Sequence, residues 1–276
     1  MAQAARGRFV LRIEDIDLAR TRVEHIDAIT TDLAWLGLTW EQPLLRQSSR
    51  FEAYREAASC LQAQRLVYPC FATRSQIAAA LADEPNPLRD PDGVTMFPAG
   101  LREFDAKHAD ARFARGEAFA LRLHMPRALD AANKRLRGVP LTFREITPEG
   151  ELDTRICRPE RWGDCVIVRK DIPASYHLAV VVDDAAQGIT HVTRGQDLYA
   201  ATDIHRLLQV LLGLPEPIYH HHRLISGPDG QKLSKSAGDQ GLAELRASGL
   251  NAETLKLQNR IICPQGAWLK NINFSV

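Results

Sequence analysis

The chain has 276 residues, of which 45% are hydrophobic, and its formal net charge is +1. This length and hydrophobic content suffice for a buried core, in one large domain or in one domain with an insertion. The balanced charge excludes a polybasic protein of the histone type, although a local basic patch would still allow RNA binding. No apolar run approaches the ~18 residues that a membrane span needs, and the opening MAQAARGRF lacks the apolar centre of a signal peptide.

The cysteines are odd in number and include no close-spaced Cys-x-x-Cys pair. They are Cys60, Cys70, Cys157, Cys165 and Cys263. This usage argues against a disulfide framework, so we expect a protein of the reducing cytoplasm.

The first elements follow from hydrophobic periodicity. Residues 8–13 form a short apolar-rich run that predicts a buried strand, and the polar run 14–17 follows it. From Thr21, apolar residues at three- and four-residue steps predict an amphipathic helix that stops at Gly37. A second helix is expected from about Ser49. Its apolar face would comprise Phe51, Tyr54, Ala58 and Leu61.

The middle of the chain gives weaker signals. Residues 73–76 form a capping-box pattern that predicts the start of a third helix. Residues 84–100 are rich in Pro, Gly and Asp and predict a loop. The whole stretch of about 66–165 has less clear periodicity, and we interpret it as an insertion with short strands such as 118–123.

The pattern becomes clear again after this insertion. The apolar run 176–182 predicts a strand that ends in a pair of aspartates, and 189–193 predicts another that leads into Arg194. A helix is expected from near Thr202 to Gly213. The alternation of strands and helices predicts an α/β fold with a mostly parallel sheet, in which ligands bind beyond the carboxyl ends of the strands.

The strongest local signal for chemistry is a five-residue string in a glycine-flanked loop. It consists of Lys232, Leu233, Ser234, Lys235 and Ser236. Two lysines three positions apart can close on a triphosphate and stabilise the charge that develops as an adenylate forms. A bare Lys-x-x-Lys would be read as an ordinary solvated loop. The full string and its upstream context favour the functional interpretation.

This string resembles the second signature of the class I aminoacyl-tRNA synthetases. Residues 12–17 (RIEDID) resemble the R-I-E-D-x-D run of the glutamyl branch, and 183–195 resembles the same branch's D-D…G-I-T-H-V-x-R-G. Two details resemble one subgroup, the glutamyl-Q tRNA(Asp) synthetases. They are the sequence of 180–198 and the end of the chain soon after the lysine loop. The resemblance covers about residues 6–250.

The resemblance implies a Rossmann-like catalytic domain of the class I type with an inserted α+β subdomain. Residues 1–66 would form the first part of the catalytic domain and 67–165 the inserted subdomain. Residues 166–240 would form the second part, with the lysine loop, and 241–276 a tail. After about Leu250 the tail has weak periodicity, and nothing in the sequence explains its role.

The resemblance also implies the ligands of glutamate. It places Glu14 against the substrate ammonium, and Tyr176 and Arg194 around the substrate carboxylates. The chemistry agrees, because a zwitterion with a second carboxylate needs an anionic partner and a guanidinium fork that pairs bidentately. Taken singly, Glu14 is also consistent with a surface acid, Tyr176 with a core aromatic and Arg194 with a surface arginine. Their shared placement at strand ends favours function.

The implied activity is ATP-dependent, tRNA-independent activation of glutamate, with Lys232 and Lys235 as catalytic residues and Mg²⁺ held mostly by the phosphates. Glutamate would then pass to the queuosine base in the anticodon loop of tRNA(Asp), a single-stranded loop of the kind that pockets accept. We expect a cytoplasmic monomer. Two alternatives stay open, namely a fragment of a glutamyl-tRNA synthetase and a catalytically inactive truncated remnant or RNA-binding module.

One departure from the family pattern lies at the front of the chain. The sequence contains neither an R-F-A-P-S-P-T-G run nor a His-x-Gly-His motif. We therefore expect that the family's first strand and helix are missing and that Met1 is an internal methionine.

A second departure concerns zinc. Some family members bind it through a C-x-C…Y-x-x-x-C pattern, which here reads Cys70, Ala72, Phe97 and Leu101. A lone thiol cannot make a tetrahedral site of Cys and His ligands, so we expect no zinc. The run 220–222 of three histidines is not expected to hold a metal either, because consecutive residues of an extended segment point to opposite faces.

Overall fold

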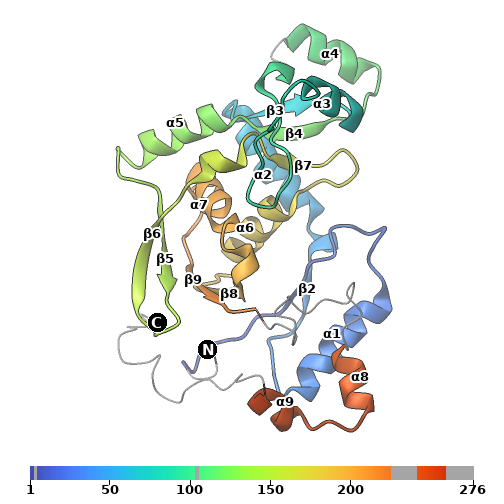
Figure 1. Ribbon diagram of the computed structural model, residues 1–276, viewed down its shortest axis with the longest axis vertical. Coiled ribbons are helices and arrows are strands. Elements are labelled where there is room, and N and C mark those ends of the chain that lie inside the picture. The colour runs from blue at the N-terminus through green and yellow to red at the C-terminus, as the bar shows by residue number, and fades with distance from the viewer. Residues whose placement is uncertain (3–4, 103–105, 225–240, 259–276) are drawn as a thin grey trace. The chain divides into compact units, whose positions relative to one another are not determined.

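The computed structural model describes residues 1–2, 5–102, 106–224 and 241–258. The chain divides into two compact units, each assembled from segments that are distant in sequence (Figure 1). Unit 1 comprises Met1–Ser49, Ile146–Leu152 and His222–Val276, and unit 2 comprises Arg50–Glu145 and Asp153–His221.

Unit 1 contains a short parallel strand pair. β1 (Arg12–Ile13) pairs with β2 (Leu45–Arg46) and is shorter than the strand expected over 8–13. α1 (Val23–Trp35) connects the two strands and confirms the first predicted helix. The later elements of this unit are α8 (Leu242–Ala247), which contacts α1, and α9 (Ala252–Gln258).

Asp15 fixes the position of the chain just after β1. Its buried carboxylate accepts hydrogen bonds from Arg46 Nε, from the Ser48 backbone N–H and from the Ser48 hydroxyl, each at 2.8 Å. Burial raises the pKa of Asp15, but the hydrogen bonds from Ser48 and Arg46 outweigh it and hold the pKa below its ordinary value. Asp15 therefore ties β1 to the short helix η1 (Gln47–Ser49) that follows β2, which is a structural role within the RIEDID run.

Packed helices form the core of unit 2 (Figure 1). α2 (Phe51–Ala63) buries Tyr54, Ala58 and Leu61, which confirms the predicted second helix and most of its apolar face. α7 (Ala201–Leu212) confirms the helix expected from near Thr202. It ends at Gly213, whose φ of 68° is left-handed, a conformation that glycine adopts without a steric cost.

The prediction of a strand over 176–182 was wrong, because this run begins α6 (Tyr176–Ala186). An uninterrupted apolar run cannot be assigned to a strand or to a buried helix by periodicity alone. The helix is buried on several sides, since it packs against both α2 and α7. The overlooked signal was Ser175, whose hydroxyl caps the helix by accepting a hydrogen bond from the Leu178 N–H at 3.4 Å.

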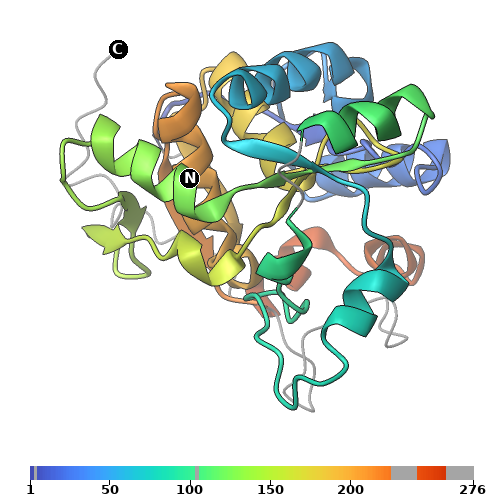
Figure 2. The same cartoon turned by 90° about the horizontal axis from the view of Figure 1, so that it is seen from above.

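The other strands form two further sheets. β3 (Val67–Cys70), β4 (Ala120–Leu123) and β7 (Val166–Val168) form an antiparallel sheet in that order, and their ribbons run side by side in Figure 2. The second sheet has the order β6-β5-β9-β8. Its strands are β6 (Leu152–Ile156), β5 (Thr142–Ile146), β9 (Ile218–His222) and β8 (His191–Gly195).

In the second sheet β5 pairs with β9 in parallel, and the strand expected over 189–193 is observed as β8, two residues later. The mixture of helices with parallel strand pairs is the α/β fold expected from the sequence. β5 and β6 fall within the range expected for the insertion and yet share a sheet with β8 and β9. The bounds of the inserted subdomain stay a prediction.

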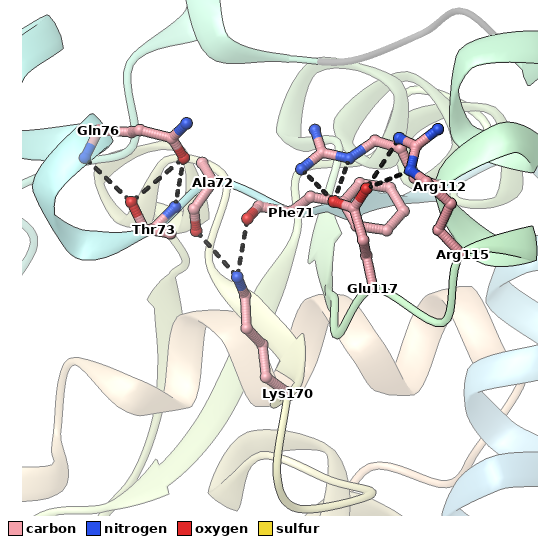
Figure 3. Close-up of polar contacts among 8 residues, drawn as sticks. All are labelled: Phe71, Ala72, Thr73, Gln76, Arg112, Arg115, Glu117 and Lys170. Carbon is pink, nitrogen blue, oxygen red and sulfur yellow. Dashed lines mark hydrogen bonds and ion pairs between the residues drawn. The ribbon is translucent and has the colours of Figure 1, made fainter.

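The capping box at Thr73 is present and starts α3 (Arg74–Ala80) (Figure 3). The Gln76 N–H donates to the Thr73 hydroxyl oxygen at 3.2 Å, and the Thr73 N–H donates to the Gln76 side-chain oxygen at 2.8 Å. The remaining helices are α4 (Ala106–Ala114) and α5 (Met125–Arg135). Among the described helices, none combines the length and the apolar character that a membrane crossing requires.

Asp183 joins α2 to α6 in the core of unit 2. Its side chain is fully buried and accepts hydrogen bonds from Arg50 Nε at 2.6 Å and from the Tyr54 hydroxyl at 2.7 Å. A buried carboxylate that loses one of these donors keeps its desolvation cost without full compensation. The aspartate pair that the sequence placed at a strand end therefore lies within a helix, and Asp183 holds two helices together.

The Tyr54→Phe variant is expected to lower the free energy of unfolding by about 1–3 kcal/mol, because it leaves the buried Asp183 short of one donor. Urea denaturation would measure this change. Glu52→Gln serves as the control, since Glu52 lies on the same helix and its ion pair among the described residues is with the exposed Arg55. Equal stability of the two variants would contradict the importance of the buried contact.

Candidate active site

Arg194 lies near the carboxyl end of β8, the kind of position where open α/β sheets bind ligands. Its half-buried guanidinium is held by side chains from two other elements. Nη2 donates to the Thr202 hydroxyl oxygen at 2.5 Å, Nη1 lies 2.9 Å from His205 Nδ1, and Nε donates to His221 Nε2 at 3.2 Å. The ring of Tyr219 lies beneath it, with its centroid 5.1 Å from the guanidinium carbon.

All of these partners are uncharged acceptors or a ring face. Within the described part of the chain, Arg194 forms no ion pair with a carboxylate. Its positive charge is therefore oriented but not neutralised. A guanidinium fork in this condition is suited to a planar, bidentate anion such as a carboxylate.

His221 connects Arg194 to a buried carboxylate. Its Nδ1 lies 2.7 Å from Glu145 Oε1, and Glu145 in turn accepts from Arg155 Nε at 3.3 Å. An arginine Nε always carries a hydrogen, so His221 Nε2 must accept and Nδ1 must carry the ring proton. Burial lowers the pKa of His221, and although the hydrogen bond to Glu145 raises it, the net pKa stays below the ordinary value.

His205 and His177 extend the arrangement towards Tyr176. His177 Nδ1 lies 3.2 Å from His205 Nε2, and the Tyr176 ring centroid lies 5.6 Å from that of His205. Burial, together with the nearby charge of Arg194, lowers the pKa of His177 to about 4. Tyr176 and Arg194 thus border the same histidine ring. Tyr176 does so from the first turn of α6. The sequence pattern had placed it at the end of a strand.

The other sequence-predicted site residues are not in this group. Glu14 directly follows β1 in unit 1, where its side chain is 45% exposed and lies 3.8 Å from Arg12 Nη2. Its place beside Tyr176 and Arg194 stays a prediction. The five residues of the lysine string, Lys232, Leu233, Ser234, Lys235 and Ser236, lie outside the described residues.

Sequence reasoning missed the residues that hold Arg194. One signal was available in β9, where burial alternates as expected for a strand: Tyr219 and His221 are buried, whereas His222 is exposed. This alternation singles out the middle histidine of the run as the inward-facing one. Nothing in the sequence marked His205 in this way. Several polar residues are buried along α7 together with the apolar ones, so helical spacing does not single out this histidine.

Comparison with known proteins decides the family. The model of the class I tRNA synthetases (E and Q), catalytic domain, matches residues 1–261. This chain belongs to that family. It is an aminoacyl-tRNA-synthetase-like ligase.

Relatives within the family support the same assignment. The chain is 43% identical to a glutamyl-Q tRNA(Asp) synthetase of Rhodobacter capsulatus, over 93% of this chain and 89% of that protein. It is 34% identical to a glutamate–tRNA ligase of Oleidesulfovibrio alaskensis, over 90% of this chain and 48% of that protein. The resemblance to the glutamyl-Q subgroup that the sequence suggested is confirmed.

A solved structure gives the same fold. The glutamate tRNA ligase of Elizabethkingia meningosepticum superposes with a TM-score of 0.67 at 24% sequence identity and covers 86% of this chain. The chain spans 47% of the length of that protein. This likeness confirms the Rossmann-like class I fold.

The family's zinc positions are apolar in this member. Tyr68, Cys70 and Phe97 form a buried hydrophobic cluster, and Ala72 and Leu101 pack against it. The four positions of the family pattern therefore do come together in space, as a small hydrophobic core. This set offers one thiol and no imidazole, so it does not fit zinc.

Two cations also border this cluster. Lys170 Nζ donates to the backbone carbonyl oxygens of Phe71 at 2.8 Å and Ala72 at 3.2 Å (Figure 3). The guanidinium carbon of Arg122 lies 4.1 Å from the ring centroid of Phe97. A divalent metal would face the repulsion of both positive groups, which adds to the lack of ligands.

We therefore expect purified protein to contain far less than one zinc per chain by elemental analysis. A chelator should leave the melting temperature unchanged, because packing and not a metal holds these residues together. One zinc per chain, with a melting temperature that falls when a chelator removes it, would show that other residues supply the ligands.

Proposed function

We propose that this chain activates glutamate with ATP, without tRNA, and transfers it to the queuosine base of tRNA(Asp). The observation that carries the proposal is the Arg194 guanidinium, which is fixed by neutral acceptors and is not paired with a carboxylate in the described residues. A substrate that supplies a carboxylate completes this site. Relatives named glutamyl-Q tRNA(Asp) synthetase point to glutamate as that substrate.

Glutamate brings an ammonium group and two carboxylates. Arg194 serves a carboxylate through its bidentate fork, and Tyr176 borders the same place through its contact with His205. The ammonium needs an anion, for which Glu14 is the candidate. A substrate that lacks one of these three charged groups would leave the matching side chain of the protein without its partner. Such sites gain their selectivity in this way.

The phosphate chemistry belongs to the lysine string. Lys232 and Lys235 stabilise the charge on the α-phosphate and the leaving pyrophosphate as glutamyl-adenylate forms, and Leu233, Ser234 and Ser236 complete the ATP-binding loop. Mg²⁺ would be held mostly by the phosphates of ATP. The protein acts as a cytoplasmic monomer.

The transfer step distinguishes this proposal from an ordinary glutamyl-tRNA synthetase. A queuosine base in an anticodon loop is accessible to a pocket because loop bases can be splayed out of the stack. The alternative is charging of a tRNA on its 3′ end. The similarity to glutamate–tRNA ligases is the observation that supports it. The two activities differ in the acceptor and are separable by experiment.

Glutamate-dependent exchange of pyrophosphate into ATP is expected without any tRNA. Lys235→Ala should slow this exchange by roughly a hundredfold or more, the scale for loss of one charge-stabilising group, while glutamate binding changes little. Lys134→Ala is the matched control, because Lys134 lies on the surface and pairs with Asp130. An unchanged turnover number for Lys235→Ala would refute the role of the loop.

Labelled glutamate should then be transferred to tRNA(Asp) that contains queuosine and not to the same tRNA without it. Transfer to tRNA(Glu) instead would favour the synthetase alternative. A protein that catalyses neither the exchange nor the transfer would be the inactive remnant.

A further inference from the structure

We propose that His205 and His221 are positioning residues for this reaction: as neutral rings, they hold the Arg194 guanidinium in place and leave its charge available to the substrate carboxylate. The inference rests on the proposed function for the identity of the substrate. The geometry of the rings carries the rest.

The tautomers of both rings follow from the donors of Arg194. A guanidinium has only N–H donors, so each ring nitrogen that faces it must present a lone pair. The two facing atoms are His205 Nδ1, at 2.9 Å, and His221 Nε2, at 3.2 Å. A doubly protonated ring at either place would set N–H against N–H and positive charge against positive charge. The single ring proton is therefore on Nε2 in His205 and on Nδ1 in His221.

The remote nitrogens have acceptors that match this assignment. The Nδ1–H of His221 donates to the Glu145 carboxylate at 2.7 Å, and the Nε2–H of His205 donates to His177 Nδ1 at 3.2 Å. The Thr202 hydroxyl, which accepts from Arg194, can donate to His221 Nε2 at 3.1 Å. One placement of protons satisfies all of the contacts named above.

The Glu145 carboxylate contacts His221 and not the Arg194 guanidinium, and this gives the arrangement its function. Glu145 is separated from Arg194 by the ring of His221, so it fixes the ring without neutralising the arginine. Burial, with the added charge of Arg194, keeps the pKa of His177 near 4, and that of His221 is also lowered. His221 therefore accepts from Arg194 as a neutral ring at neutral pH, and the neutral His177 accepts from His205. A direct Arg194–Glu145 pair would compete with the substrate for the same fork.

Matched substitutions test the positioning role. His221→Leu removes the acceptor at Nε2, whereas His221→Gln can place its amide oxygen there; His205→Leu and His205→Asn form the equivalent pair for Nδ1. Each Leu variant should raise the Kd for glutamate by about 10- to 100-fold, the scale for a hydrogen bond to a charged group, and the amide variants should recover most of it. The KM for ATP should change by less than about twofold, because ATP does not use this fork.

His108→Leu is the control, since His108 lies exposed on α4. If the amide variants bind glutamate as weakly as the Leu variants, or if the KM for ATP rises along with the Kd for glutamate, the effect is general damage to the fold and the positioning role is refuted.

A second measurement needs no substrate and no active variant. In wild-type protein labelled with ¹⁵N in its histidines, NMR should show His221 as the Nδ1–H tautomer and His205 as the Nε2–H tautomer, both neutral at pH 7. The amide variants assign the two signals. A protonated ring, or the opposite tautomer at either position, would overturn the inference even if glutamate binds normally. Failure of the wild-type protein to bind glutamate would instead overturn the proposed substrate.

Discussion

A half-buried guanidinium needs acceptors for its N–H groups, and the way this chain supplies them determines the rest of the site. An aspartate or glutamate would satisfy Arg194 and cancel its charge. The chain uses a hydroxyl and two imidazoles instead. The carboxylate of Glu145 contacts the other ring nitrogen of His221 and not the guanidinium. Orientation and neutralisation are thereby separated. The arginine is held in place while its charge stays available, which is the preorganisation that a binding site for an anion requires.

This arrangement depends on elements that are far apart in sequence. Arg194 comes from β8, His205 and Thr202 from α7, His221 from β9 and Glu145 from β5. The sheet order β5-β9-β8 brings the strands together, and α7 packs against α6, whose first turn carries Tyr176. Asp183 fixes α6 to α2 through Arg50 and Tyr54. A buried carboxylate in the helical core therefore supports the element that presents Tyr176.

The sequence predicted what depends on local pattern and missed what depends on tertiary packing. α2 and α7 follow from apolar spacing and from Gly213, and the start of α3 follows from the capping box at Thr73. α6 was taken for a strand because its apolar run has no period that separates a buried helix from a buried strand. Arg194 was found by resemblance, whereas His205 and His221 were not, since their role exists only once β8, β9 and α7 meet. Likewise, the sequence shows which residues occupy the zinc positions, but only the fold shows that Ala72, Phe97 and Leu101 gather around Cys70 as a hydrophobic cluster.

The account centres on the claim that the charge of Arg194 is kept for a substrate carboxylate. Calorimetric titration of L-glutamate into wild-type protein and into Arg194→Gln tests it most directly. The glutamine amide can still donate hydrogen bonds to the histidines, so the change removes the positive charge with little disturbance of the surrounding rings. The account predicts a loss of glutamate affinity of about 10- to 100-fold or more, with an unchanged melting temperature. An affinity within about twofold of the wild type would contradict it, because a fork that can be removed without loss does not hold the substrate.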